Sequence, residues 1–408
     1  MAISDPLVPA AGSPAIRAGK DTRYLSLDFW RGVACLMIVV FHGSFDLIDN
    51  PDVAHPGWAG KCITRVITHL WLGVPIFFVI SGYCITAACD SARSRPHPTK
   101  QYFIRRFRRI YPPYWIVLLL LFLLMMAPWL AGHPDLFSTE GDLTHRMSSF
   151  SISQWFGNFT LTEGFRPHLF GGGSWFFLGP AWTLCYEEQF YAICGLLLLT
   201  AGRHFFPAAA CLTAGVAGVV ALTAFTKLPV AGFFFDGHWL LFAAGMVVYY
   251  RIHHGSERFA RLAGAGMILA GVTAIVLRVV TKVYTEEYYV GFFFAFLLAV
   301  LYRWDFAIAT NRLLRPITYC GIMCYSLYLI HWPVAKLVSH IFYVLGIKEE
   351  WAAILLVIPF CTVLAAALGW GFHLVVERRF LNTPPVLPWR VKQRKEEQCA
   401  DPAPSVPA

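Results

Sequence analysis

Charged residues are scarce in this sequence of 408 residues. Asp, Glu, Lys and Arg make up 14% of the chain, whereas hydrophobic residues make up 57%. Soluble domains carry about 25% charged residues, so a water-exposed surface for a chain of this length cannot be built from this supply. The 34 Phe, 14 Trp and 17 Tyr exclude an intrinsically disordered chain. The composition therefore indicates an integral membrane protein.

Short motifs for metal, redox and nucleotide chemistry are missing. None of the 11 cysteines forms a C-x-x-C pair, and there is no H-E-x-x-H motif and no glycine-rich phosphate loop. Most of the cysteines stand in apolar runs, where Cys behaves as a small hydrophobic residue. We therefore expect no metal site. The first twenty residues are polar and contain proline, unlike a cleaved signal peptide.

Long apolar runs are abundant, and about 20 mostly apolar residues suffice for a helix to cross a bilayer. Ten runs of this kind lie near 27–48, 70–90, 112–132, 181–201, 205–226, 231–250, 262–280, 288–304, 317–344 and 351–376. The weakest are 181–201, which contains two adjacent glutamates, and 288–304, which is short. The expected fold is an all-α integral membrane protein with about ten transmembrane helices.

The basic residues predict the orientation of the chain. If the N-terminus is cytoplasmic, 24 of the 33 Lys and Arg fall in segments on the inner side of the membrane, which leaves 9 outside. An excess of this kind is typical of short cytoplasmic loops. We therefore expect both termini to be cytoplasmic. The net charge of +9 then reports orientation, and we expect no nucleic-acid partner.

Three parts are expected along the chain. Residues 1–23 form a cytoplasmic N-terminal segment, residues 24–380 form the transmembrane domain, and residues 381–408 form a Pro-rich, charged tail expected to be disordered. Only the loop 133–180 on the outer side is long, and such loops are often functional. The two halves show no internal repeat, which argues against an inverted-repeat transporter.

The first apolar run holds the most informative polar residues. Arg31 and His42 are 11 residues apart, which places them on one helix face with an axial separation of about 16 Å. Asp46 follows His42 by four residues, and Asp28 precedes Arg31 by three. Ionisable groups at bilayer depth are costly and mark a function or a water-filled cavity. The alternative is an interfacial Asp28–Arg31 ion pair with His42 bound to a neighbouring helix, but the complete stripe favours function.

Four arginines precede the third apolar run. Arg105 with Arg108, and Arg106 with Arg109, form two overlapping Arg-x-x-Arg pairs. Guanidinium groups one helical turn apart can clamp a phosphate. The alternative is an orientation signal that contacts lipid headgroups, and taken alone this second interpretation is favoured.

Two further sites leave their interpretation open. Glu187 and Glu188 point about 100° apart on a helix, so at most one of them faces a given cavity, and a helix N-terminus would also favour both. His331 stands two residues before Pro333, where we expect a kinked helix. A structural role and a site role fit His331 equally well.

Five motifs occur in an order that resembles the acyltransferase family 3 membrane proteins. They are LDFWRG with its Arg-x10-His, FFVISGYCIT (77–86), RRFRRIYPPYW (105–115), WTLCYEEQFY (182–191) and YSLYLIHWP (325–333). The resemblance runs from about Tyr24 to Phe380. It implies transfer of an acyl group, usually acetyl, from acetyl-CoA in the cytoplasm. The acceptor would be a hydroxyl of a carbohydrate or glycolipid at the outer side of the cytoplasmic (inner) membrane.

The resemblance also assigns residues. The family's Arg-x10-His falls on Arg31 and His42, its Arg-x-x-Arg on either arginine pair, and its Glu on Glu187 or Glu188. Thr183 stands where Ser is common, a mild difference. Because only about 28 residues follow the domain, we expect a stand-alone membrane module rather than one fused to a hydrolase-like domain.

These interpretations combine into one hypothesis. The arginines would hold the CoA phosphates at the inner face; they are Arg31, Arg105, Arg106, Arg108 and Arg109. His42 would act as a general base on the acceptor hydroxyl or carry the acyl group for a short time. Asp46, Glu187 or Glu188 would orient the imidazole, and the loop 133–180 would bind the acceptor.

The rival from another class is a transporter or flippase of a lipid-linked glycan. It would use the His–carboxylate stripe of the first run as a proton relay. That function predicts repeat symmetry and charged residues spread over both halves, whereas the polar motifs here gather in the first half. A non-catalytic membrane sensor would account for none of the ordered motifs.

Overall fold

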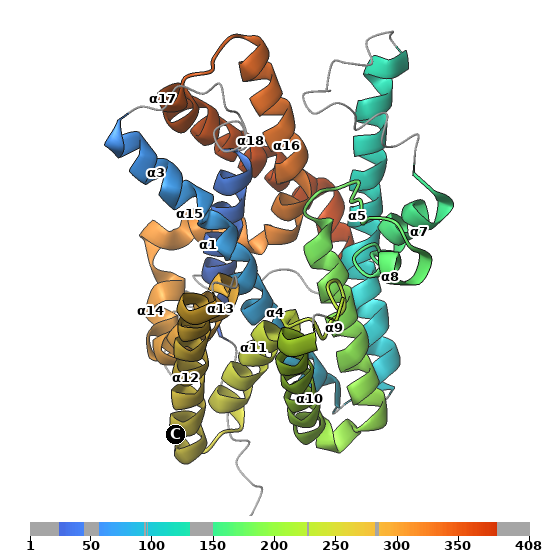
Figure 1. Cartoon of the computed structure of the whole chain (residues 1–408), viewed down its shortest axis with the longest axis vertical. Coiled ribbons are helices and arrows are strands. Elements are labelled where there is room, and N and C mark those ends of the chain that lie inside the picture. Colours follow the sequence, from blue (N-terminus) through green and yellow to red (C-terminus); the bar gives the residue numbers. More distant parts are fainter. Residues whose placement is uncertain are drawn as a thin grey trace, which may run out of the picture.

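The fold is known from a computed structural model, which describes residues 24–44, 57–93, 95, 97–130, 150–226, 228–281 and 285–381. Within these ranges every regular element is a helix, so the expected all-α class is confirmed (Figure 1). Four predictions concern residues outside the described ranges in whole or in part. They concern Asp46, the segment 1–23, the first part of the loop 133–180, and nearly all of the tail 381–408.

Each of the ten predicted apolar runs contains a helix. The longer helices are α1 (Leu27–His42), α3 (Trp58–Thr68), α4 (Gly73–Arg93), α5 (Pro98–Leu130), α7 (Ile152–Thr160), α9 (Ala181–Thr200), α10 (Phe205–Thr226), α11 (His238–His253), α12 (Glu257–Thr281), α13 (Glu286–Leu301), α15 (Arg315–Ile322), α16 (Cys324–Val344) and α18 (Ile358–Phe372). The shorter ones are η1 (Leu70–Leu72), α8 (Arg166–Phe170), η3 (Gly202–His204), η4 (Tyr302–Trp304), α14 (Asp305–Thr310), η5 (Arg312–Leu314), α17 (Glu350–Ala352), η6 (Ala353–Val357), η7 (His373–Glu377) and α19 (Arg378–Phe380).

The described chain is that of a multi-pass membrane protein. Six of its helical segments are long and apolar enough to cross a membrane, or seven if one bent pair counts as a span. Others fall short because α1 and α11 have 16 residues each. Such helices rise about 24 Å, less than the roughly 30 Å of a hydrocarbon core. The count of ten and the cytoplasmic position of both termini stay predictions.

The bent pair changes direction ahead of α16. Residues Arg312–Ile322 and Cys324–Val344 meet at 76°, so the sharp bend lies at Met323. The sequence also predicts a kink at Pro333, because a proline removes one backbone donor from a helix. Pro333 lies inside α16, which continues through it as a helix, and the kink itself stays a prediction.

Helix α1 lies in the middle of the bundle, where it contacts α4, α15, α16 and α18 (Figure 1). Its start is fixed by Asp305 of α14. The two carboxylate oxygens accept hydrogen bonds from the backbone amides of Leu25 (2.8 Å) and Ser26 (2.7 Å). Amides at a helix start lack intrahelical partners, and a carboxylate also interacts favourably with the helix dipole. This clamp fixes the position of α1 along the bundle.

Two glycines let α4 and α11 touch. A Cβ atom on Gly82 of α4 would lie 1.9 Å from the carbonyl oxygen of Phe242, and one on Gly245 of α11 would lie 1.9 Å from that of Val79. Small residues allow membrane helices to approach this closely. The glycine inside the FFVISGYCIT motif therefore has a packing role.

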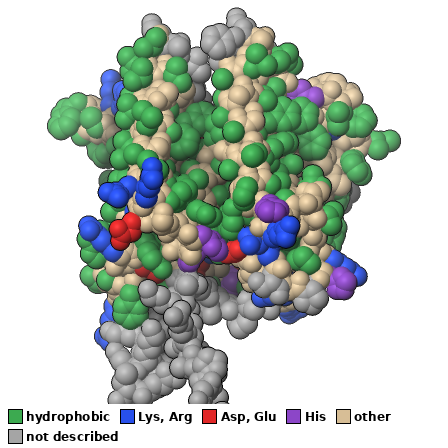
Figure 2. Space-filling view, turned by 90° about the horizontal axis from the view of Figure 1, so that it is seen from below, with side chains coloured by type: hydrophobic (Ala, Val, Ile, Leu, Met, Phe, Trp, Pro, Cys, Tyr) green, Lys and Arg blue, Asp and Glu red, His purple; other side chains and the backbone are tan. Residues whose placement is uncertain are grey.

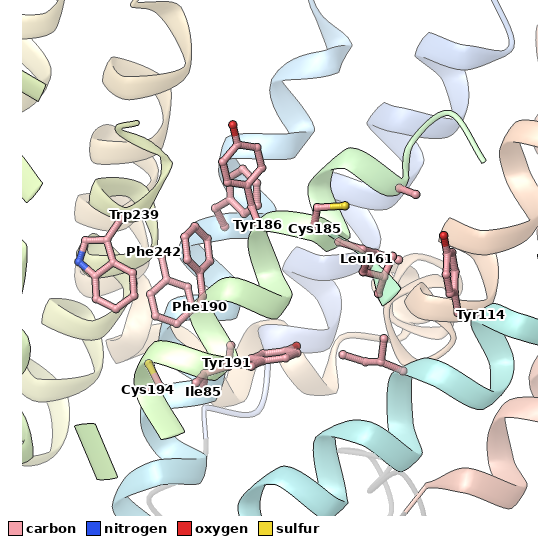
Figure 3. Close-up of a cluster of buried hydrophobic side chains, with 14 of the residues drawn as sticks. Ile85, Tyr114, Leu161, Cys185, Tyr186, Phe190, Tyr191, Cys194, Trp239 and Phe242 are labelled. Atoms are coloured by element: carbon pink, nitrogen blue, oxygen red, sulfur yellow. The ribbon is translucent and has the colours of Figure 1, made fainter. Parts of the chain in front are cut away.

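Aromatic side chains hold α9 between α5 and α11. The ring of Phe190 lies 5.6 Å from that of Trp239 and 4.8 Å from that of Phe242, between centroids, and all three are fully buried. Figure 3 shows Trp239 and Phe242 on one side of α9 and Tyr114 of α5 on the other. This packing sets the rotation of α9 about its axis, and therefore which of its polar residues face inward.

The described part of the loop 133–180 is folded around an ion pair. Glu163 and Arg166 are both buried, with Nε of Arg166 2.7 Å from the carboxylate. The same guanidinium donates to the carbonyl oxygens of Gly171 (3.0 Å) and Gly173 (2.6 Å). The loop thus contains α7 and α8 and a fixed glycine turn, although its sequence indicated no regular structure.

The outside of the bundle is largely hydrophobic. Leu199 of α9, Val280 of α12 and Leu355 of η6 are among the large apolar side chains that are exposed. Figure 2 shows one face of the molecule, on which hydrophobic side chains cover a broad area and most charged residues and histidines gather in a band. A largely apolar exterior fits the membrane environment that the composition predicts.

Gly245→Ala is expected to lower the free energy of unfolding by about 1–3 kcal/mol, because the added Cβ overpacks the contact with Val79. Thermal unfolding of the detergent-solubilised protein, followed by Trp fluorescence, measures the change. Gly215→Ala in α10 is the matched control, since nothing lies within 4 Å of its Cβ position. The control should melt at or above the wild-type temperature. An unchanged melting temperature for Gly245→Ala would contradict the close helix contact.

Candidate active site

A cavity lies among five helices that close into a ring. In this ring α1 contacts α4, α4 contacts α9, α9 contacts α5, α5 contacts α16, and α16 returns to α1. The side chains surround about 1290 Å³ of empty space, including the open mouth. The walls are mostly apolar, with few charged residues and histidines. These are Arg31, Arg106, Arg109, Glu187, His42 and His331.

The two predicted residues of the first run both line the cavity. Helix α1 is continuous from Arg31 to His42, so the two Cα atoms are about 16 Å apart along its axis. Arg31 forms the ion pair with Asp28 at 2.6 Å, and its Nη2 atom lies 2.7 Å from Sγ of Cys84. The Asp28–Arg31 ion pair of the alternative interpretation therefore exists, and Arg31 also lines the cavity. The spacing predicted the shared face correctly.

Of the four arginines in α5, one pair faces inward. Arg106 and Arg109 line the cavity, whereas Arg105 and Arg108 are exposed. The guanidinium of Arg106 lies 5.0 Å from the centroid of the Tyr191 ring. Neither Arg106 nor Arg109 forms an ion pair within the described residues. Arginines without counterions in a cavity are suited to an anionic ligand.

The adjacent glutamates point to different places. Glu187 lines the cavity, where its Oε1 atom accepts hydrogen bonds from the hydroxyls of Ser81 (2.6 Å) and Tyr191. Glu188 is not part of the wall, and the hydroxyl of Tyr111 on α5 donates to it at 3.4 Å. This follows from the 100° offset of neighbouring residues on a helix. The carboxylate of Glu187 joins α4 to α9.

A second histidine joins His42. His331 of α16 stacks on the His42 ring, with 5.0 Å between centroids and 29° between planes. Nδ1 of His331 lies 2.6 Å from the carbonyl oxygen of Tyr328. The sequence left a structural and a site role equally open for this residue, and the structure places it in the cavity beside His42.

Sequence reasoning missed the residues that connect one motif to another. Ser81 bonds to Glu187, which lies 106 positions later in the chain. The Tyr328 hydroxyl is 3.0 Å from that of Thr183, 145 positions away. All four residues lie inside the quoted motifs. Contacts between motifs are invisible to spacing rules, because those rules describe one helix at a time.

The cysteines of the described residues are free thiols. Half of them are buried, namely Cys35, Cys89, Cys185, Cys194 and Cys361. Three cysteines line the cavity: Cys35, Cys84 and Cys324. Within the described ranges no group of three or more His, Cys, Asp or Glu could hold a metal ion.

The five helices that carry the motifs lie within one domain that matches a known protein family. A family model described as an acyltransferase domain, Acyl_transf_3, matches residues 24–370. The chain belongs to the acyltransferase 3 family. The match covers all five helices of the cavity ring, so this cavity lies wholly within the family domain.

Two curated relatives share this domain. The peptidoglycan O-acetyltransferase OatA of Listeria monocytogenes is 29% identical over 188 residues, which is 44% of this chain and 26% of OatA. YrhL of Bacillus subtilis, assigned provisionally to the same activity, is 29% identical over 205 residues, or 50% of this chain and 28% of YrhL. The matched part thus spans about a quarter of the relatives' length. No solved structure matches the chain.

Arg31→Ala is expected to destabilise this acyltransferase 3 domain, since Asp28, only 8% exposed, would lose its cation. Leaving a buried charged group without its partner costs roughly 1–3 kcal/mol. Thermal unfolding in detergent measures the loss. Combining Arg31→Ala with Asp28→Asn should restore part of it, and Arg105→Ala at an exposed position should change nothing. If Arg31→Ala melts like the wild type, the ion pair contributes no stability.

Proposed function

We propose that this protein is a membrane O-acyltransferase that moves an acetyl group from acetyl-CoA to a hydroxyl of a carbohydrate or glycolipid. The proposal rests on one observation: a single cavity carries arginines at one end and two stacked histidines at the other. Cys324 of α16 lies within electrostatic reach of both Arg31 and Arg109, so these arginines share one end. On the same helix His331 lies seven residues further, about 10 Å along the axis.

The arginine end fits a phosphorylated donor. Arg31, Arg106 and Arg109 place three guanidinium groups in the wall, and among the described residues only Arg31 has a carboxylate partner. Guanidinium groups bind phosphate through paired, charge-assisted hydrogen bonds. A transporter of a lipid-linked glycan would account for histidines within the membrane, but it gives no reason for two arginines without counterions. We therefore favour the acyltransferase.

The histidine end fits the transfer itself. An acceptor hydroxyl must lose its proton as its oxygen bonds to the acyl carbonyl carbon, and the bond from that carbon to the CoA sulfur must break. A neutral imidazole can take the proton, or can bind the acyl group for a short time. Both roles are chemically open to His42. Apolar side chains, among them Phe41, Trp71 and Phe77, line the same cavity.

The topology of the proposal places donor and acceptor on opposite sides. With residues 24–380 forming ten spans and both termini in the cytoplasm, the arginine end opens toward cytoplasmic acetyl-CoA. His42 then lies toward the outer side of the cytoplasmic (inner) membrane, where the described part of the loop 133–180 would contact the acceptor. OatA is named for peptidoglycan O-acetylation, so a cell-surface glycan is the acceptor class to test first.

His42→Ala is expected to lower acetyl transfer at least about 100-fold, the usual contribution of a positioned acid–base or nucleophilic group. Release of free CoA thiol by purified protein, given acetyl-CoA and membrane glycans, measures the rate. Mass spectrometry of surface glycans in a complemented knockout tests the same loss in cells. His204→Ala, at an exposed position outside the cavity, is the control. No CoA release by the wild type, or full activity of His42→Ala, would contradict the proposal.

The two arginine pairs of α5 allow a matched comparison. Replacing Arg106 and Arg109 by Ala should raise the KM for acetyl-CoA at least tenfold, since each lost charge-assisted hydrogen bond is worth about 1.5–3 kcal/mol. Replacing Arg105 and Arg108 by Ala should leave KM within twofold. The opposite result would put the phosphates on the exposed pair. Equal KM values in both variants would make the cluster an orientation signal only.

A further inference from the structure

One ring nitrogen of His331, in the cavity wall, has no hydrogen-bond partner among the described residues. His331 is 1% exposed, and its Nε2 atom is buried without a hydrogen-bond partner among the described residues. Leaving a buried polar atom unpaired costs about 1–3 kcal/mol, so native proteins rarely do so without a reason. Because this side chain lines the cavity, a ligand in the cavity is the natural source of the missing partner.

The hydrogen bonds of Nδ1 fix the state of the ring. Nδ1 lies 2.6 Å from the carbonyl oxygen of Tyr328 and 3.1 Å from that of Leu327. A carbonyl oxygen only accepts, so Nδ1 carries the hydrogen, and in the neutral ring Nε2 holds the lone pair. Both carbonyls belong to α16 itself, which ties the ring to its own helix. An imidazole held in this tautomer has the form that a general base requires.

The neighbouring hydroxyls are already engaged with backbone. Tyr328 donates its hydroxyl hydrogen to the carbonyl oxygen of Pro180, and Tyr325 donates to that of Ile110 at 2.8 Å. Neither is therefore directed at Nε2 of His331. The other close aromatic group is the ring of His42, stacked at 5.0 Å, which presents its face rather than an edge. An aromatic face in this position stabilises a positive charge on the ring beside it.

We propose that His331 is a second catalytic residue, the base of the acyl transfer; this rests on the proposed function and deepens it. Nε2 takes the proton of the acceptor hydroxyl while the hydroxyl oxygen bonds to the acyl carbonyl carbon. The bond between that carbon and the CoA sulfur breaks, and the proton passes from Nε2 to the departing sulfur, which yields the free thiol. His331 thus takes the role of base that was also open to His42, and His42 contacts the acyl group and supports the charged His331 ring with its face.

A purely structural histidine would need only the hydrogen bond of Nδ1, whereas a catalytic base also needs Nε2. A variant that keeps the first and removes the second therefore tests the proposal. In His331→Asn the side-chain amide nitrogen takes the place of Nδ1 and can still donate to the Tyr328 carbonyl, while Nε2 is gone. We expect the melting temperature to stay within a few degrees and the KM for acetyl-CoA to stay within threefold. The rate of CoA release with acceptor should fall at least 100-fold. His331→Ala, which removes both nitrogens, should lose stability as well.

The control is His253→Asn, a half-buried histidine outside the cavity, whose variant should keep a rate within twofold of the wild type. The assignment is overturned if His331→Asn keeps more than a tenth of the wild-type rate. It is also overturned if this variant loses activity only together with its melting temperature and its acetyl-CoA binding. A wild-type protein that releases no CoA would instead overturn the proposed function itself. The failure of the two ideas is therefore distinguishable.

Discussion

An ionised side chain inside a bilayer must be paired, reach water or bind a ligand, and the cavity is organised by this constraint. Arg31 is paired with Asp28, and Glu187 accepts two hydroxyl hydrogen bonds. Arg106 lies over an aromatic ring, and Arg109 forms no ion pair in the described chain. The cations are thus only partly compensated by the protein. The remaining positive potential lies at one end of an apolar cavity. In such surroundings water and salt weaken it less than they would at the surface of a soluble protein.

The five sequence motifs have a simple structural meaning. Each of them supplies one helix of the ring around the cavity, in the chain order α1, α4, α5, α9 and α16. The described residues between the motifs form the other helices of the bundle and the connections between them. This is why any single motif is a weak signal, and why all five together are specific. The Ser81–Glu187 and Thr183–Tyr328 contacts join these motifs side by side.

Periodicity within one helix could be predicted from the sequence, and contacts between helices could not. The shared face of Arg31 and His42 followed from their spacing alone. For the arginines and for Glu187 and Glu188, the same rule left two choices open, because only the packing of α9 and α5 decides which side faces inward. The position of His331 in the cavity could not be predicted, because it depends on stacking against His42, which lies 289 positions earlier in the chain. The bend at Met323 was also hidden, since no proline or charge marks it.

The hydrogen bonds that Asp305 accepts at the start of α1 bear on the length of the acyl donor in the proposed function. Asp305 lies 280 positions from Leu25, so a late segment of the chain sets the depth of the earliest helix. Because α1 is unbroken, Arg31 and His42 cannot move independently, and the distance between them along the helix is constant. In the proposed reaction, a donor bound by its phosphates at one end of the cavity would bring its reactive carbon to a fixed distance along α1. Selection of the donor would then depend on reach as well as on chemistry.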